Sequence, residues 1–136
     1  MDQHEEAIKI SNLAIKIDPS RFGSYLIKAI SQIKQHHFED AIASLNSVIL
    51  LDNTQHKAYA LKGQALHCLK RYKEAVIQLD IALFISQDPS YLIQKADSLL
   101  ELKKYKEAIT VYEDALLEGS QENDYINEKL KSIQLN

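Results

Sequence analysis

The chain repeats itself with a period of about 34 residues, and this period constrains the fold more than any other feature. The string Tyr72-Lys73-Glu74-Ala75 recurs as Tyr105-Lys106-Glu107-Ala108, with weaker copies at 38–41 and 4–7. The alanines that end the four strings, Ala7, Ala41, Ala75 and Ala108, are separated by 34, 34 and 33 residues. Seven residues beyond them stand Ala14, Val48, Ala82 and Ala115, and four beyond stand Ser11, Leu45, Leu79 and Tyr112. Offsets of four and seven place side chains on one face of a helix, so each copy predicts a helix.

A second helical segment precedes this one in the three full copies. It carries a large, a small and a third residue at offsets of four and seven: Tyr25, Ala29 and Gln32, then Tyr59, Gly63 and Leu66, then Leu92, Ala96 and Leu99. The small middle residue allows the backbone of a neighbouring helix to come close. Since glycine inside a helix costs about 1 kcal/mol relative to alanine, Gly63 indicates a packing requirement.

This pattern resembles the tetratricopeptide repeat family, whose 34-residue unit has a large–small–large helix A followed by a helix B with two alanines. Pro19 stands at the position where the family often has proline. The resemblance covers the whole chain. It implies an all-α fold, namely a right-handed α-solenoid of antiparallel helix pairs with about eight helices.

The phase of the repeat divides the chain. We expect a single domain over residues 1–136, with helix B alone at 2–17, full repeats at 22–55, 56–88 and 89–122, and a terminal helix A at 124–135. Asn53 replaces the usual proline, and Gln32 replaces a large apolar residue. Glycine is also missing from the A-to-B turns, where His36-His37, Lys70-Arg71 and Lys103-Lys104 stand. These departures predict looser packing around the first full repeat.

Composition narrows the class of protein. The 16 basic and 19 acidic residues give a net charge of −3, which argues against a protein that binds nucleic acid in bulk. A single cysteine, Cys68, leaves no intramolecular disulfide. The acidic N-terminal segment does not resemble a signal peptide, and no apolar run is long enough to span a bilayer. We therefore expect a cytoplasmic or other reducing, soluble compartment.

The resemblance implies that the A helices line a concave groove that binds another protein, as a peptide or a helix. In the family, the residues facing this groove occupy the second, fifth, ninth and twelfth positions of each repeat. Here they are Gly23, Leu26, Ile30 and Ile33, then Lys57, Ala60, Gln64 and His67, then Ser90, Ile93, Asp97 and Leu100. A solvent-facing stripe of Leu26, Ile30 and Ile33 is expected to be covered by a partner. The alternative is that these side chains are buried against neighbouring helices.

Some members of the family hold the C-terminal carboxylate of a chaperone in a clamp of Lys, Asn and Arg. At the corresponding fifth and ninth positions this chain has Leu26, Ile30, Ala60 and Gln64, and at the sixth position it has Ile27, Leu61 and Gln94. Only Lys57 has a suitable charge. The sequence therefore predicts that no chaperone carboxylate clamp is present.

The first helix begins in the middle of a repeat. Ala7, Ser11 and Ala14 would normally contact a helix A that this sequence does not include. One interpretation is a divergent first repeat. The other is a possible end contact, through which the chain self-associates, docks on another chain, or continues the stack of a larger repeat protein.

Other chemistry has less support. Basic residues in the A-to-B turns would form one edge that an RNA or another acidic partner could use, although charges at helix ends also favour the helix dipole. The five histidines lack the paired spacing of a zinc module. Cys68 has no catalytic partner pattern, and no glycine loop could hold a phosphate. We expect no enzyme activity, no cofactor and no metal.

Overall fold

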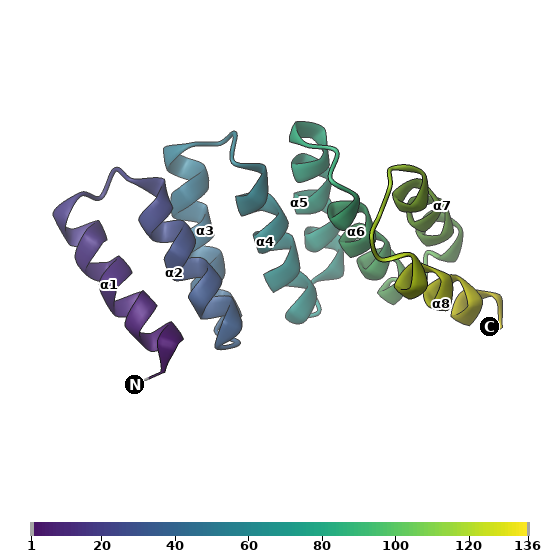
Figure 1. The fold of residues 1–136 in the computed structure, drawn as a ribbon, viewed down its shortest axis with the longest axis horizontal. Coiled ribbons are helices and arrows are strands. Elements are labelled where there is room, and N and C mark those ends of the chain that lie inside the picture. Colours follow the sequence, from purple (N-terminus) through teal and green to yellow (C-terminus); the bar gives the residue numbers. More distant parts are fainter. Residues whose placement is uncertain (1, 136) are drawn as a thin grey trace.

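The computed structural model describes residues 2–135, which fold into eight helices. Their bounds are α1 Gln3–Ile17, α2 Phe22–Lys34, α3 Phe38–Leu51, α4 His56–Cys68, α5 Tyr72–Ile85, α6 Pro89–Glu101, α7 Tyr105–Leu117 and α8 Asn123–Gln134. Figure 1 shows them side by side in chain order, from α1 at one end to α8 at the other. The predicted all-α solenoid is confirmed. The domain proposed for residues 1–136 includes both terminal residues, which lie outside the described residues.

The helices form two layers. Each helix packs against the next, and further contacts join α2 to α4 and α4 to α6. Among residues 2–135, no comparable contact joins the B helices α1, α3, α5 and α7 to one another. Because successive A helices approach more closely than successive B helices, the solenoid curves with its A helices on the concave side.

The repeated small residues lie where helices pack most tightly. Ala29, Ala41, Ala75, Ala82, Ala96, Ala108 and Ala115 are all fully buried. A Cβ added to Gly63 would lie 2.9 Å from Leu79 Cγ and 3.3 Å from the Ala75 carbonyl oxygen. The packing requirement inferred from Gly63 is therefore the close approach of α5 to α4.

Gln32, which departs from the family pattern, is buried and paired. Its Oε1 accepts a hydrogen bond of 2.7 Å from the Ser44 hydroxyl on α3. A buried polar group must be hydrogen-bonded to avoid a large desolvation cost. A polar contact therefore replaces the usual apolar one between α2 and α3.

Three A-to-B turns have the same backbone geometry. His36, Lys70 and Lys103 each have φ of 62°, in the left-handed region that favours glycine. The next amide in each turn donates back to the helix, as from His37 to the Gln32 carbonyl at 2.8 Å. These are Schellman caps, so the turns keep the family's geometry although they lack its glycine.

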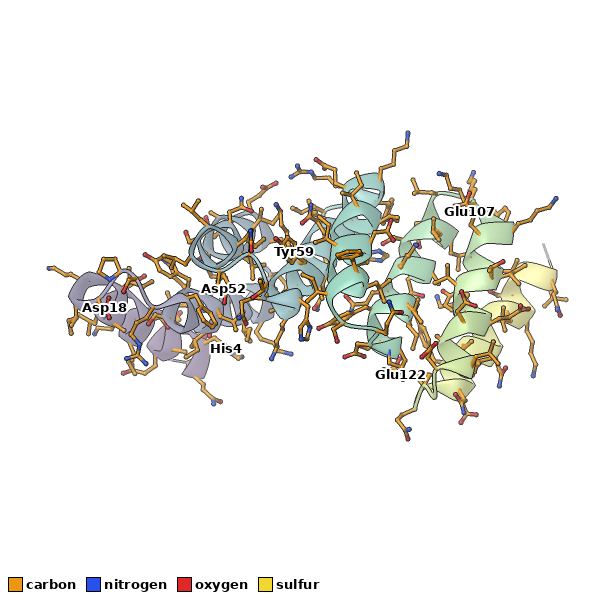
Figure 2. The ribbon with its side chains drawn as sticks, turned by 90° about the horizontal axis from the view of Figure 1, so that it is seen from above. His4, Asp18, Asp52, Tyr59, Glu107 and Glu122 are labelled. Atoms are coloured by element: carbon orange, nitrogen blue, oxygen red, sulfur yellow. The ribbon has the colours of Figure 1, made fainter. Side chains whose placement is uncertain are left out.

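The first three B-to-A turns, which lie along the upper edge in Figure 1, each contain an aspartate: Asp18, Asp52 and Asp88. Ser20 and Thr54 each donate backbone and hydroxyl hydrogen bonds to the aspartate two residues earlier. These bonds lower the pKa of Asp18 and Asp52, both labelled in Figure 2. Only Asp88 among the three caps the following helix, by accepting from the Ser90 amide at 2.9 Å.

Candidate functional site: the concave face of the A helices

A cavity of about 290 Å³ opens on the concave side between α4 and α6. Its lining residues are Gly63, Gln64, His67, Leu79, Gln94 and Asp97. The structure thus brings together Gln64, His67 and Asp97, which the sequence placed in the groove. It adds Gln94, which was not among the predicted groove residues but stands at the sixth position, one of those compared with the carboxylate clamp.

The cavity exists because the helices around it carry small or polar residues at the meeting point. Gly63 allows Leu79 of α5 to come close to α4, and Leu79 forms the back wall of the cavity. Gln64 is exposed, whereas His67, Gln94 and Asp97 are half-buried. The site is therefore a pocket with a polar wall on a packed helical frame.

Two phenols hold Asp97 in place. The buried Tyr112 of α7 donates to Oδ1, and Tyr125 of α8 donates to Oδ2 at 2.8 Å. Burial and the hydrogen bond to the Asp97 carboxylate raise the pKa of both phenols well above the usual range. Both tyrosines are therefore neutral donors, and they fix the direction of a negatively charged group.

His67 is also held by its neighbours. Its Nδ1 lies 2.8 Å from the Ser98 hydroxyl, and its ring meets the Tyr72 ring edge-on at 5.1 Å between centroids. Ser98 is fully buried in α6. The repeat register, which selects surface positions, gave no signal for Ser98 or for either tyrosine that supports Asp97.

Three of the predicted groove residues lie in the core. Ile33, Ala60 and Ile93 are only 7%, 4% and 4% exposed, and each belongs to a cluster of buried apolar side chains. The physical reason is the contact between successive A helices, which covers side chains that point toward the next A helix. The interpretation that groove positions are buried therefore applies to these three.

The other predicted groove residues remain accessible to different degrees. Lys57, Gln64 and Ser90 are exposed, while Gly23, Leu26, Ile30, His67, Asp97 and Leu100 are half-buried. Leu26 packs against the core that contains Ile33. The expected apolar stripe on α2 is thus reduced to the outer parts of Leu26 and Ile30.

The predicted end contact is already partly occupied within the chain. Ser11 is buried and Ala7 and Ala14 are half-buried, on a helix that packs against α2. A partner helix could not reach Ser11 without displacing α2. The open face of α1 instead carries Ile10, Leu13 and Ile17, which are 57%, 56% and 85% exposed.

The basic edge is partly neutralised. Arg71 donates from Nη2 to Glu74 at 3.0 Å and lies 3.8 Å from Glu39 of the preceding repeat. Acidic residues in the first turns of the B helices thus compensate part of the positive charge.

Cysteine and histidine show no arrangement for chemistry. Within residues 2–135, no three side chains of His, Cys, Asp or Glu come together as metal ligands would. Partial burial raises the pKa of the Cys68 thiol, which lowers its thiolate fraction. Within the same residues, no helix is both long enough and apolar enough to cross a membrane.

Comparison with known proteins identifies the class. The family model described as anaphase-promoting complex, cyclosome, subunit 3, matches residues 48–115, which is half of the 136 residues. The chain belongs to this family of tetratricopeptide repeats.

One curated relative of the chain is a much longer protein. The chain is 33% identical over 91 residues to the Protein SGT1 homolog of Oryza sativa subsp. japonica, covering 66% of this chain and 25% of that protein. It therefore spans about a quarter of the length of this curated relative.

Solved structures share the fold. A thermophilic tetratricopeptide repeat protein of Thermus thermophilus aligns with a TM-score of 0.80 at 16% identity, over 95% of this chain and 72% of that one. The Yersinia enterocolitica type III secretion chaperone SycD, in complex with a peptide of the translocator YopD, aligns with a TM-score of 0.78 at 17% identity, over 83% and 92%. At these identities the likeness establishes the fold alone.

Proposed function

We propose that the chain is a non-catalytic adaptor that binds a peptide or helix of another protein along the concave face of its A helices. The observation that carries this proposal is the cavity between α4 and α6, where Gln64, His67 and Asp97 converge. Its polar groups are positioned by neighbouring side chains before any ligand arrives. A site that is already ordered loses less conformational freedom on binding.

The concave face also offers two kinds of surface side by side. Leu26 and Ile30 on α2 present half-buried apolar side chains, and the cavity farther along presents polar ones. Together they suit an amphipathic segment that lies across successive A helices. SycD, which shares the fold, was crystallised with a peptide, and this supports the same class of ligand for the present chain. We place the protein in a cytoplasmic or other reducing compartment.

The test is selection of binding peptides from a random library displayed on phage, followed by affinity measurement with two matched variants. Gln64→Arg changes an exposed residue of the cavity, and Asn46→Arg changes an exposed residue of α3. We expect Gln64→Arg to weaken binding at least about tenfold, and Asn46→Arg to leave it unchanged. Equal effects of the two variants, or a selection that yields no peptide, would contradict the proposal.

A second candidate is a structural subunit that assembles through the open face of α1. The exposed Ile10, Leu13 and Ile17 support it, because they follow one another at helical spacing. Sedimentation of the wild type beside Leu13→Glu tests this candidate. A wild-type monomer over the micromolar range would remove self-association.

A further inference from the structure

The wall of the α4–α6 cavity carries a hydrogen-bond acceptor that lacks a donor. Gln94 lines the cavity, and its Oε1 is buried without a hydrogen-bond partner among the described residues. A buried acceptor without a donor is costly, and such an atom in a native fold calls for an explanation. A ligand that brings a donor would remove this cost.

Asp97 adds a negative charge to the same wall. Its hydrogen-bond partners are the neutral phenols of Tyr112 and Tyr125. Across residues 2–135 no Lys, Arg or His lies within ion-pair distance of its carboxylate. Each carboxylate oxygen can accept more than one hydrogen bond, so Asp97 retains capacity for a further donor.

The neighbouring cations of α4 and α6 form no ion pair with Asp97. Lys57 of α4 is exposed and does not line the cavity. Lys95 of α6 pairs with Asp80 on α5. Lys62 of α4 lines a different cavity with Arg71 and Glu74. His67, the other titratable group of the wall, already has its Nδ1 against Ser98. The chain thus leaves the negative charge of this cavity to be matched from outside.

We infer that the α4–α6 cavity takes a basic side chain of the bound polypeptide, which pairs with Asp97 and, when the Gln94 side chain turns toward the cavity, donates a hydrogen bond to Gln94 Oε1. This inference rests on the proposed function, and it gives the ligand a required chemistry. It also reverses the sign of the carboxylate clamp, for which this groove has only Lys57 as a basic residue. The cavity of about 290 Å³ gives a long side chain room, and Gln64 stands exposed in its lining as an additional hydrogen-bonding group.

The direct test uses small probes and needs no selected peptide. The probes are N-acetyl-arginine methylamide and its citrulline analogue, which is neutral and nearly the same shape. Each is titrated into ¹⁵N-labelled protein while the amide resonances are followed. We expect the arginine probe to shift the Gln94 side-chain amide and the backbone around residues 63–67 and 94–97, and to bind at least about tenfold more tightly than citrulline. Equal shifts with both probes, shifts confined to other surfaces, or no shifts would overturn the inference.

Three variants locate the interaction. Asp97→Asn keeps the shape and one oxygen acceptor, and should abolish the preference for arginine over citrulline. Gln94→Met removes the unpartnered acceptor and should weaken arginine binding severalfold while the protein remains folded. Asp114→Asn removes an exposed carboxylate of α7 and is the control that should change nothing. A preference for arginine that survives Asp97→Asn would contradict the inference even if that variant is less stable, because only the ratio between probes is compared.

The two proposals fail in different ways. Peptides selected on the concave face that contain no Lys or Arg, together with a negative probe titration, would overturn the basic side chain and leave the adaptor proposal intact. An arginine-specific cavity without any peptide binding would do the opposite.

Discussion

Two neighbouring intervals of the concave face follow one repeat register and yet have opposite character. Between α2 and α4, Ile33 and Ala58 are buried in the same apolar cluster. Between α4 and α6, Gly63, Gln94 and Asp97 surround a cavity into which polar side chains are gathered. Register decides which positions face the next A helix. The size and polarity of the side chains there decide whether the interval closes as core or remains open as a site.

The largest effect on stability should come from removing an apolar side chain from the packed contact between α2 and α4. Ile33→Ala is expected to lower the free energy of unfolding by about 2–4 kcal/mol, because it leaves a cavity in the core. Ile30→Ala, at a half-buried position, should cost roughly half as much. Urea unfolding followed by circular dichroism measures both. If Ile30→Ala costs as much as Ile33→Ala, then Ile30 belongs to the core and the apolar part of the binding face is lost.

The next largest effect on stability concerns the buried hydrogen bond between Ser44 and Gln32, which joins α3 to α2. Ser44→Ala leaves Gln32 Oε1 without its donor and should cost about 1–3 kcal/mol. The double change Gln32→Leu with Ser44→Ala should recover most of that loss, since both polar groups are then gone. Thermal unfolding of the two variants decides this. A double variant less stable than Ser44→Ala alone would show that the pair is required for the shape of the α2–α3 contact.

Two glycine-to-alanine changes should affect the free energy of unfolding in opposite directions. Gly63→Ala places a Cβ against Leu79 and the Ala75 carbonyl, and should destabilise by about 1 kcal/mol after the gain in helix propensity is included. Gly23→Ala meets nothing within 4 Å and should stabilise by about 0.5 kcal/mol. The measurement is the shift in denaturation midpoint at constant slope. Stabilisation by both changes would mean that α5 moves easily away from α4.

The smallest effects on stability are expected in the turns after α2 and after α4, and they should be equal in size. His36→Gly and Lys70→Gly relax the left-handed position of a Schellman cap after α2 and after α4, and each should stabilise by about 0.5–1 kcal/mol. Thermal unfolding of the two variants, compared with Lys34→Gly in the last turn of α2 as a destabilising control, tests this. Unequal gains would show that the two turns differ in more than the backbone angle.

The repeat pattern predicted the helices well because its repeated residues are those at which helices pack against one another. Ala41, Ala75 and Ala108 are fully buried where the period placed them, and Gly63 meets α5 as its small size indicated. The described residues form eight helices, from α1 at Gln3 to α8 at Gln134, which agrees with the predicted number. Each repeat consists of two helices, and each helix has an apolar face. Stacking successive repeats is one of the few arrangements that buries both faces.

The site was less predictable, since it depends on contacts between repeats. Nothing in the register distinguishes Ile93, which is buried, from Asp97, which lines the cavity four residues later. Gln94 was compared with the carboxylate clamp for its charge alone, so its neutral amide was not counted among the groove residues. The support of Asp97 by Tyr112 and Tyr125 joins three helices, so no local sequence signal could reveal it.

The left-handed caps at His36, Lys70 and Lys103 have a consequence for how the protein loses its structure. In a linear array, stability divides into what each helix pair has alone and what neighbours add at their interfaces. Three side chains held in a backbone conformation that costs about 1 kcal/mol each weaken the pairs and not the interfaces. Unfolding is thereby made more cooperative, since a pair that loses its neighbours cannot persist. Three glycines would raise the melting temperature and, at the same time, allow partly unfolded arrays to accumulate.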